Sequence, residues 1–344
     1  MKHSYLGALH IHTTYSDGTK DVDYVIKQAA KAGLKWIIIT DHNTHKPLAH
    51  EGFHNGVCVI AGCEITPQKA NHLLAFGTTE DISEEIGERN YIDEVHKQNG
   101  ICFAAHPDES IHRDNRQTPL RWEDWSIDTI DGLEIWNYLT DWTDNYSINK
   151  NKLLQYLNRH NMPKGPTKNV LAWWDRLNNK KEHLVPAIGG MDAHAFRIGR
   201  HGFWVKISDY YDFFTALNNV VLLDKPLSSD FKEAKEQIIN ALKNANNIII
   251  NRKVINKTNV DFYIQNKGQK YYVGEIAELD NYTKLVAKLP CNALIRLIHN
   301  GVLIYETTSK VLEYDRLEQG KYRLEIYRNN KPWIFTNPIK VVWY

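Results

Sequence analysis

The stretch Leu6-Gly-Ala-Leu-His10-Ile-His12-Thr-Thr-Tyr-Ser-Asp17-Gly18 stands near the start of the chain and decides the fold. Its first part, Leu6–Ile11, is a short apolar run that predicts a buried strand. Residues two apart on a strand face the same side, so His10 and His12 can point at one metal ion while Ile11 faces the core. Asp17 follows in a turn, which brings a carboxylate within reach of the same place.

Six further apolar runs follow along the chain, and histidine or carboxylate residues stand beside five of them. In four of these five the residues follow the run, whereas His72 precedes its run. Runs of this kind, apolar on both faces and separated by helices, predict parallel βα units, and at least seven units fit a closed or distorted barrel better than an open sheet. The ligand-type residues would then gather at the carboxyl ends of the strands, where α/β barrels place their chemistry. These runs and their neighbours are Trp36–Thr40 with Asp41 and His42, Val57–Ala61 with Glu64, Leu73–Phe76 with His72, Ile101–Ala105 with His106, Leu133–Trp136, and Val185–Ile188 with Asp192 and His194.

The pattern of the chain changes after about residue 248. Before it, helices are expected over Val22–Lys31, Tyr91–Gln98, Lys152–His160 and Phe231–Asn244. After it come short alternating strands without a convincing helix, and Asn300-Gly301 and Asn329-Asn330 mark hairpin turns. We therefore expect an α/β barrel over residues 1–248 and a small all-β sandwich over 249–344, with Trp333 and Trp343 in the sandwich core.

Composition limits the classes of function. The 344 residues carry a net charge of +1, which argues against a strongly electrostatic nucleic-acid or membrane binder. The amino-terminal residues show no secretion signal, and no apolar run is long enough to span a bilayer. The four cysteines have no zinc-ribbon spacing and are expected to be reduced, three of them in buried strands, which favours a cytoplasmic protein. They are Cys58, Cys63, Cys102 and Cys291.

Nitrogen and carboxylate ligands without thiolates suit zinc, manganese or iron better than calcium or magnesium. Nine ligands are too many for one ion, so two or three divalent ions sharing a bridging carboxylate are expected. Such a cluster lowers the pKa of bound water and polarises a substrate oxygen, which is the chemistry of hydrolysis. Each residue alone has an ordinary interpretation, such as a turn residue or a core histidine, but the joint pattern favours a metallohydrolase. The nine residues are His10, His12, Asp17, His42, Glu64, His72, His106, Asp192 and His194.

As an ordered set, these residues resemble the PHP (polymerase and histidinol phosphatase) family of metallohydrolases. The resemblance implies a distorted (β/α)7, TIM-like barrel with two or three metal ions at its carboxyl face. It also implies a division of the ligands into three sites. These are His10, His12, Glu64 and Asp192 for the first ion, a bridge by Glu64 to a second ion held by His72 and His106, and Asp17, His42 and His194 for the third.

A closer likeness is to the CehA/McbA branch of the family, which includes carboxyl-ester or carbamate hydrolases as well as phosphoesterase-like members. Met191 stands where a serine is common in the family. The motifs that carry this likeness are Glu64-Ile-Thr66, His72-Leu-Leu-Ala-Phe-Gly77, Glu134-Ile-Trp-Asn137 and Phe335-Thr-Asn-Pro-Ile339.

Charge favours an anionic substrate. Three divalent ions, three carboxylates and one hydroxide leave a net charge of about +2, which attracts a phosphate ester. We expect a hydroxide bridging two ions to attack phosphorus, with a third ion and an arginine holding the oxygens and His201 or water protonating the leaving group. The predicted catalytic residues are Asp192, His194, His201 and Arg113. The predicted substrate-binding residues are Arg113, Arg116, Arg197, Arg200 and His201, although each arginine could equally be solvated surface charge.

Three functions stay open at this point. The leading one is a phosphoesterase acting on a phosphomono- or diester of a small molecule or nucleotide. The second is carboxyl-ester or carbamate hydrolysis on the same ions, and the third is a non-catalytic binding module. Six of the ten tryptophans fall between Trp122 and Trp174. Of these, Trp142, Trp173 and Trp174 either line an aromatic substrate pocket or, as the sequence slightly favours, pack helices on the barrel.

Overall fold

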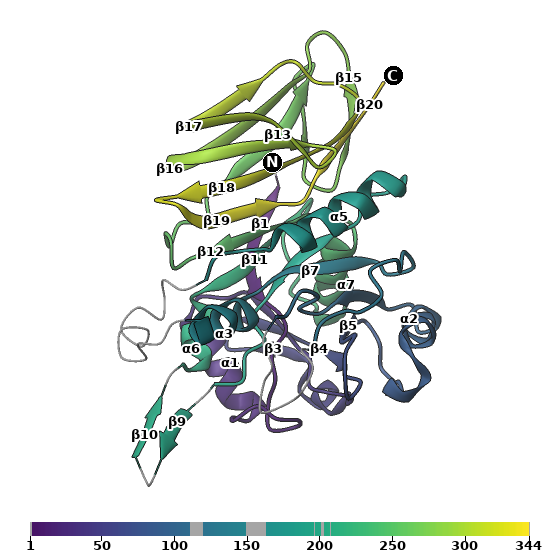
Figure 1. The fold of residues 1–344 in the computed structure, drawn as a ribbon, viewed down its shortest axis with the longest axis vertical. Helices are drawn as coiled ribbons and strands as arrows, with labels where there is room; N and C mark the ends of the chain where they lie inside the picture. The colour runs from purple at the N-terminus through teal and green to yellow at the C-terminus, as the bar shows by residue number, and fades with distance from the viewer. Residues whose placement is uncertain are drawn as a thin grey trace.

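A computed structural model describes residues 2–110, 120–148, 163–195, 197–200, 203–206 and 208–343. Figure 1 shows two stacked bodies: a lower one of strands and helices, and an upper one of strands from the last third of the chain. The β9–β10 hairpin projects from the lower body. The helix expected over Lys152–His160 lies outside the described residues. Among the described helices, none has both the length and the apolarity needed to cross a membrane.

Seven strands of the lower body pair in a closed ring. Successive pairings join β1 to β2, β2 to β4, β4 to β5, β5 to β6, β6 to β7 and β7 to β8. A parallel bridge between Ile11 and Ala193, just beyond β1 and β8, closes the ring. The expectation of a closed seven-stranded arrangement agrees with these pairings. The strands are β1 (His3–Ala8), β2 (Trp36–Ile39), β4 (Val57–Ile65), β5 (Leu73–Phe76), β6 (Ile101–Ala104), β7 (Gly132–Asn137) and β8 (Ala187–Gly190).

Strand β5 corrects the prediction of uniformly parallel units, because it runs antiparallel to both β4 and β6. The connection from β4 to β5 holds only residues 66–72 and no helix. A crossover to a parallel strand needs a dozen or more residues, so a connection this short forces the chain to reverse. The reversal explains why His72 precedes its strand: the start of an antiparallel strand lies at the carboxyl ends of its neighbours.

The helices of the lower body agree with the sequence pattern where the apolar period was clear. Helix α1 has the predicted bounds, and Asp21 accepts a hydrogen bond from the Tyr24 amide as its N-cap. Helix α7 ends one residue before the predicted Asn244. The described helices are α1 (Val22–Lys31), α2 (Glu88–Lys97), α3 (Tyr138–Ile148), α5 (Lys168–Lys180), α6 (Tyr210–Phe214) and α7 (Phe231–Lys243), with 3-10 turns η1 (Lys46–His50) and η2 (Glu84–Ile86). Further strands are β3 (Gly52–His54), β9 (Arg197–Arg200), β10 (Phe203–Lys206), β11 (Leu217–Leu223) and β12 (Asn247–Asn251).

The upper body contains only strands and turns, as expected. Both predicted hairpin turns are present: Asn300-Gly301 joins β16 to β17, and Asn329-Asn330 joins β18 to β19, with positive φ at all four residues. The pairings are antiparallel apart from β15 with β20, which is parallel. The strands are β13 (Asp261–Asn266), β14 (Gln269–Tyr272), β15 (Ile276–Leu279), β16 (Lys284–His299), β17 (Val302–Tyr314), β18 (Gly320–Arg328), β19 (Lys331–Thr336) and β20 (Ile339–Trp343).

Strand β12 joins the two bodies. It pairs with β11 on one side and with β19 on the other, so hydrogen bonding continues from the lower body into the upper one. The expected boundary at residue 248 falls inside this strand, and the division of the chain there stays a prediction. Three fully buried asparagines, Asn219, Asn247 and Asn337, also hydrogen-bond the backbone of β8 at Ala187 and Gly189, so β8 is held from both bodies.

Three of the four tryptophans Trp173, Trp174, Trp333 and Trp343 are buried in the core. Trp173 and Trp174 are buried in α5, and the Trp174 indole nitrogen donates to the Val185 carbonyl oxygen at 2.7 Å. Trp333 is fully buried, as expected, but Trp343 is 64% exposed. It is the last residue of β20, and the prediction of a core position was wrong for Trp343. The cysteines Cys58, Cys63 and Cys102 lie in buried strands, as predicted.

Candidate metal centre

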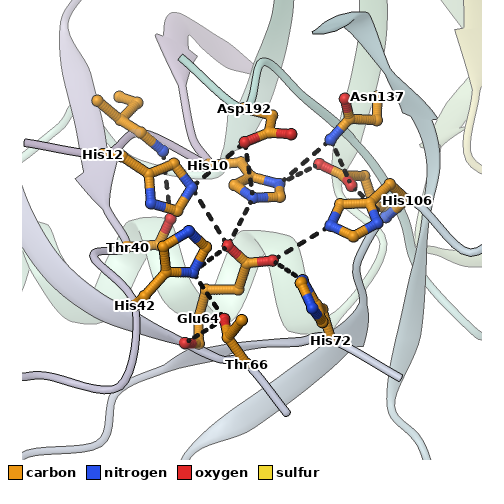
Figure 2. Close-up of polar contacts among 12 residues, drawn as sticks. His10, His12, Thr40, His42, Glu64, Thr66, His72, His106, Asn137 and Asp192 are labelled. Carbon is orange, nitrogen blue, oxygen red and sulfur yellow. Dashed lines mark hydrogen bonds and ion pairs between the residues drawn. The ribbon is translucent and has the colours of Figure 1, made fainter. Parts of the chain in front are cut away.

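Glu64 lies at the middle of a group of histidines at one end of the strand ring (Figure 2). Its Oε1 lies 3.0 Å from His72 Nδ1 and 3.2 Å from His106 Nε2. Its Oε2 lies 3.2 Å from the Nε2 atoms of both His10 and His12, and 3.1 Å from His42 Nδ1. One carboxylate therefore contacts five imidazoles that come from four different segments of the chain.

Asp192 closes the opposite side of the group. Its Oδ1 lies 3.4 Å from His12 Nε2 and 3.7 Å from His10 Nε2, while the Asp192 backbone carbonyl accepts a hydrogen bond from His194 Nδ1 at 2.9 Å. That bond fixes the tautomer of His194 and leaves its Nε2 facing Asp17 Oδ1 at 3.0 Å. The two-apart spacing of Asp192 and His194 thus brings both side chains to one place.

Asp17 marks the opening of the site. Its side chain is 59% exposed, whereas the other carboxylates of the group are buried, and its Oδ1 also lies 3.5 Å from His42 Nε2. His42 is 24% exposed. Asp17 and His42 are therefore the members of the group that solvent reaches most easily.

The backbone at the site is strained in three places. His10, His106 and Asp192 have φ values of 63°, 28° and 51°, in the left-handed region that L-residues rarely occupy. Each follows the end of a buried strand, where the turn aims the side chain inward. Strain of this kind persists only where the surroundings enforce it, and it gathers at functional sites.

The donor atoms fit metal ions. Within the described residues, the buried nitrogens His12 Nδ1 and His72 Nε2 have no hydrogen-bond partner. Leaving such groups bare costs free energy, which a cation would recover. In this group, three sets of side chains each bring their donor atoms within 4.8 Å of one another, and all these donors are nitrogen or carboxylate oxygen. The sets are His12, Asp17, His42 and His194; His10, His12 and Asp192; and His10, Glu64 and His106.

The charges of the group shift its pKa values. Burial opposes ionisation of Glu64, but His10 and His42 outweigh burial and hold the pKa of the carboxyl well below its usual range. For His42, burial is outweighed by Glu64 and Asp17, which raise its pKa to about 10. At His72 burial dominates and lowers the pKa to about 4. The same carboxylates also raise the pKa values of His10 and His106 against burial, so the group holds negative charge that a cation could balance in place of these protons.

Glu134 is the main residue of the site that the ligand prediction missed. It is buried in β7, and its Oε1 accepts from His10 Nδ1 at 2.7 Å, which leaves His10 Nε2 for a ligand role. Its Oε2 accepts from the His106 backbone amide at 2.6 Å and from Asn137 Nδ2 at 3.0 Å. Gly190 makes room for it, because a Cβ there would lie 1.6 Å from Oε1. A lone glutamate inside an apolar strand was the sequence signal.

We expect Glu134→Gln to lower metal affinity or turnover by about 10- to 100-fold, the usual effect of losing a partner that orients a metal ligand. The amide nitrogen of glutamine would face the His106 amide or the His10 ring instead of accepting from it. Metal titration and steady-state kinetics measure the effect. Glu278→Gln, on the distant strand β15, is the control, and an unchanged affinity and rate for Glu134→Gln would contradict the role.

Two further side chains hold the loops that carry ligands. Asp41, which is fully buried, accepts from the Thr13 amide at 2.7 Å and from the Ser16 hydroxyl at 2.6 Å, and so fixes the turn that leads to Asp17. The Thr66 hydroxyl lies 2.6 Å from His42 Nδ1. Asp41 therefore supports the ligands, although its place beside His42 in the sequence is that of a ligand.

The predicted substrate-binding residues are not placed. Arg113, Arg116 and His201 lie outside the described residues, and so do the side chains of Arg197 and Arg200 in β9. The catalytic assignments to Arg113 and His201 therefore stay predictions, whereas Asp192 and His194 lie in the group described above.

A profile of the PHP domain matches residues 8–329. The chain belongs to the PHP domain family. The matched region includes all nine predicted ligands and most of the upper body. The match of this PHP domain protein to the family profile therefore extends beyond the lower body.

Three proteins of known sequence or structure are similar to this PHP domain protein. An uncharacterized protein of Methanocaldococcus jannaschii is 30% identical over 161 residues, which cover 41% of this chain and 88% of that protein. The phosphoribosyl 1,2-cyclic phosphate 1,2-diphosphodiesterase of Eggerthella lenta is 35% identical over 80 residues, or 21% of this chain and 30% of that enzyme. A two-domain Bacteroides vulgatus protein containing a predicted PHP-like metal-dependent phosphoesterase matches in structure, with a TM-score of 0.46, 14% identity, and coverage of 98% of this chain and 95% of that one.

Proposed function

We propose that this PHP domain protein is a metal-dependent phosphoesterase that hydrolyses a phosphomono- or diester of a small molecule or nucleotide. The observation that carries the proposal is the convergence of all nine predicted ligands in one group. Divalent ions held there would polarise a phosphate ester and stabilise the charge that develops as it is hydrolysed. The name of the Eggerthella lenta relative, a phosphodiesterase, supports the same class.

The residues divide into binding and orienting roles. His10, His12, Glu64 and Asp192 would hold one ion, Glu64 with His72 and His106 a second, and Asp17, His42 and His194 a third. Zinc, manganese or iron in these positions would polarise the ester and lower the pKa of water. Glu134 keeps the His10 ring in the tautomer that points its Nε2 inward, and the Asp192 carbonyl does the same for His194. His201 or water is the proposed proton donor to the leaving group.

A cleft of about 470 Å³ lies beside the group. It is the proposed binding place for the part of the substrate beyond the ester. His106 and Glu134 border it on one side, and residues 164–168 with helix α3 border it on the other. Its lining carries both signs of charge, with Lys164 and Lys168 beside Asp108, Asp141 and Asp144. A second cleft, of about 610 Å³, is lined by Trp122, Trp125 and Trp173 but by none of the nine ligands. We therefore place the substrate in the first cleft.

Carboxyl-ester or carbamate hydrolysis is the second candidate, and one observation favours it. Residues of the CehA/McbA-like motifs contact the ligands directly: Thr66 contacts His42, and Glu134 contacts His10. The motifs that resemble this branch thus include residues that support the metal ligands. Carboxyl-ester or carbamate hydrolysis on the same ions is therefore the alternative. The third candidate, a non-catalytic binding module, need not hold stoichiometric metal.

A matched set of nitrophenyl esters tests these candidates. Manganese-loaded protein is assayed with the phosphate monoester, the phosphate diester and the carboxylate ester. We expect a phosphate ester to be preferred. Preference for the carboxylate ester would assign the second candidate, and absence of bound metal on elemental analysis would favour the binding module.

Asp192→Ala should lower the turnover of the preferred ester by at least about 100-fold, since it removes a proposed ligand without disturbing the core. Circular dichroism and thermal unfolding check that the variant is folded. Turnover like that of the wild type in a folded Asp192→Ala variant would remove Asp192 from the proposed centre.

A further inference from the structure

A further set of metal-ligand side chains lies away from the metal centre, at the other end of the strand ring. It consists of His96 in the last turn of α2, Cys102 near the start of β6 and Asp131 directly before β7. Helix α2 lies at the outer edge of the lower body (Figure 1). Cys102 precedes the ligand His106 by four residues, roughly 13 Å along an extended strand. The set is therefore separate from the nine ligands, and none of its members takes part in the proposed hydrolysis.

The three donor atoms are close enough to share one ion. His96 Nε2 lies 3.0 Å from Asp131 Oδ2 and 4.0 Å from Cys102 Sγ, and all three atoms lie within 4.8 Å of one another. In a tetrahedral zinc site, bonds of about 2.0–2.3 Å put the donor atoms roughly 3.3–3.6 Å apart. Shifts of about half an ångström or less would therefore admit the ion.

The geometry does not suit a nucleophilic cysteine. In a catalytic triad the histidine bonds its two partners through different ring nitrogens. Here the one nitrogen, His96 Nε2, faces both the sulfur of Cys102 and the carboxylate of Asp131. Cys102 is also fully buried, so a substrate could not reach its sulfur. One nitrogen that faces two other donors is the arrangement around a shared ion.

The surroundings hold the donors in place and leave one side open. Asp131 Oδ2 accepts a hydrogen bond from the Cys102 backbone amide at 2.8 Å, which fixes these two residues to each other. The side chains of His96 and Asp131 are 38% and 27% exposed, so an ion and a water ligand could enter from their side. Lys181 is a nearby cation, and its Nζ donates to the Ile130 carbonyl oxygen at 2.8 Å.

We propose that His96, Cys102 and Asp131 bind one zinc ion, with water as the fourth ligand. A sulfur donor beside nitrogen and oxygen favours zinc over manganese, magnesium or calcium. A thiolate and a carboxylate would balance the charge of the divalent ion. Without the ion, burial and Asp131 raise the pKa of the Cys102 thiol well above its usual range, so binding would release a proton to solvent. The ion would join α2 to the amino ends of β6 and β7, the face of a barrel that serves stability.

Cobalt binding tests the proposal, because a thiolate bound to Co²⁺ gives a near-ultraviolet charge-transfer band that nitrogen and oxygen ligands do not give. The nine ligands of the main centre include no cysteine, so this band reports a cysteine site even when cobalt also fills the main centre. We expect the band in the cobalt-loaded wild type, and excess Zn²⁺ should abolish it. A cobalt-loaded wild type without the band would overturn the proposal.

Variants assign the band to this set. Cys102→Ser should lose it, whereas Cys63→Ser, at another buried cysteine that stands next to Glu64, is the matched control and should keep it. His96→Gln changes a partly exposed residue and should weaken cobalt binding by at least about tenfold, since the loss of a partner that only orients a ligand already costs that much. A band that Cys102→Ser keeps, or an unchanged affinity in His96→Gln, would overturn the assignment.

Asp192→Ala separates this proposal from the proposed function. It removes a ligand of the main centre and should leave the cobalt–thiolate band unchanged. Loss of hydrolysis with the band retained would show two independent sites, and loss of the band in this variant would contradict a separate site.

Discussion

Glu64→Gln is expected to lose bound metal and to lower hydrolysis of the preferred ester by at least about 10³-fold. The glutamine has nearly the shape of the glutamate but lacks its charge, and its amide group would turn two hydrogens toward histidines that now share a carboxylate. Both oxygens of Glu64 contact imidazoles, so no rotation of the side chain spares the site. Elemental analysis of the purified variant and single-turnover kinetics measure the two losses.

Glu51→Gln is the matched control for this experiment. Glu51 is also largely buried and paired, with Lys235 at 2.6 Å, but it lies outside the nine ligands. It should keep wild-type metal content and rate. If Glu64→Gln retained full metal and activity, the ligands would not share the central carboxylate, and the three-site assignment would fail.

Arg323→Met is expected to lower the free energy of unfolding by about 3 kcal/mol or more. Arg323 is 5% exposed and holds Asp175 of α5 with two hydrogen bonds, at 2.9 and 2.8 Å, and Glu325 with a third at 2.7 Å. Its guanidinium also lies over the Trp174 ring. Removing it leaves two nearly buried carboxylates without a counter-charge, where the upper body meets α5.

Urea unfolding of Arg323→Met and of Arg296→Met gives the comparison. Arg296 pairs with Glu306 at the surface, where both side chains are more than a third exposed, and such pairs contribute about 0–1 kcal/mol. If the free energy of unfolding fell equally in the two variants, burial would not be what makes the Arg323 contacts stabilising.

The lower body could be predicted from the sequence because its strands are apolar runs of ordinary length, and because every ligand except His72 follows such a run. His10 and His12 needed only the two-residue period of a strand to be placed together. The same reasoning fails where a long-range contact decides the outcome. The direction of β5 depends on its partners and on a short connection, and Trp343 looks like a core residue until its neighbours are known.

The role of Glu134 shows the same limit within the site. A glutamate in an apolar strand signals a buried function, but the sequence does not say which histidine it orients. That assignment depends on β7 and the segment after β1 being brought together by the fold, across a separation of 124 residues. The local sequence pattern is thus enough to predict which residues are ligands. It is not enough to predict which residues orient them.

Strand β8, which leads directly into Asp192 and His194, is held by asparagines from β11, from β12 and from the segment after β19. The amide of Asn337 alone bonds both the Ala187 carbonyl and the Asn247 carbonyl. Warming that loosens the last strands of the chain would therefore also free the backbone that aims two of the ligands. Heat inactivation of this protein should follow the melting of its carboxyl-terminal strands, even though none of the nine ligands lies there.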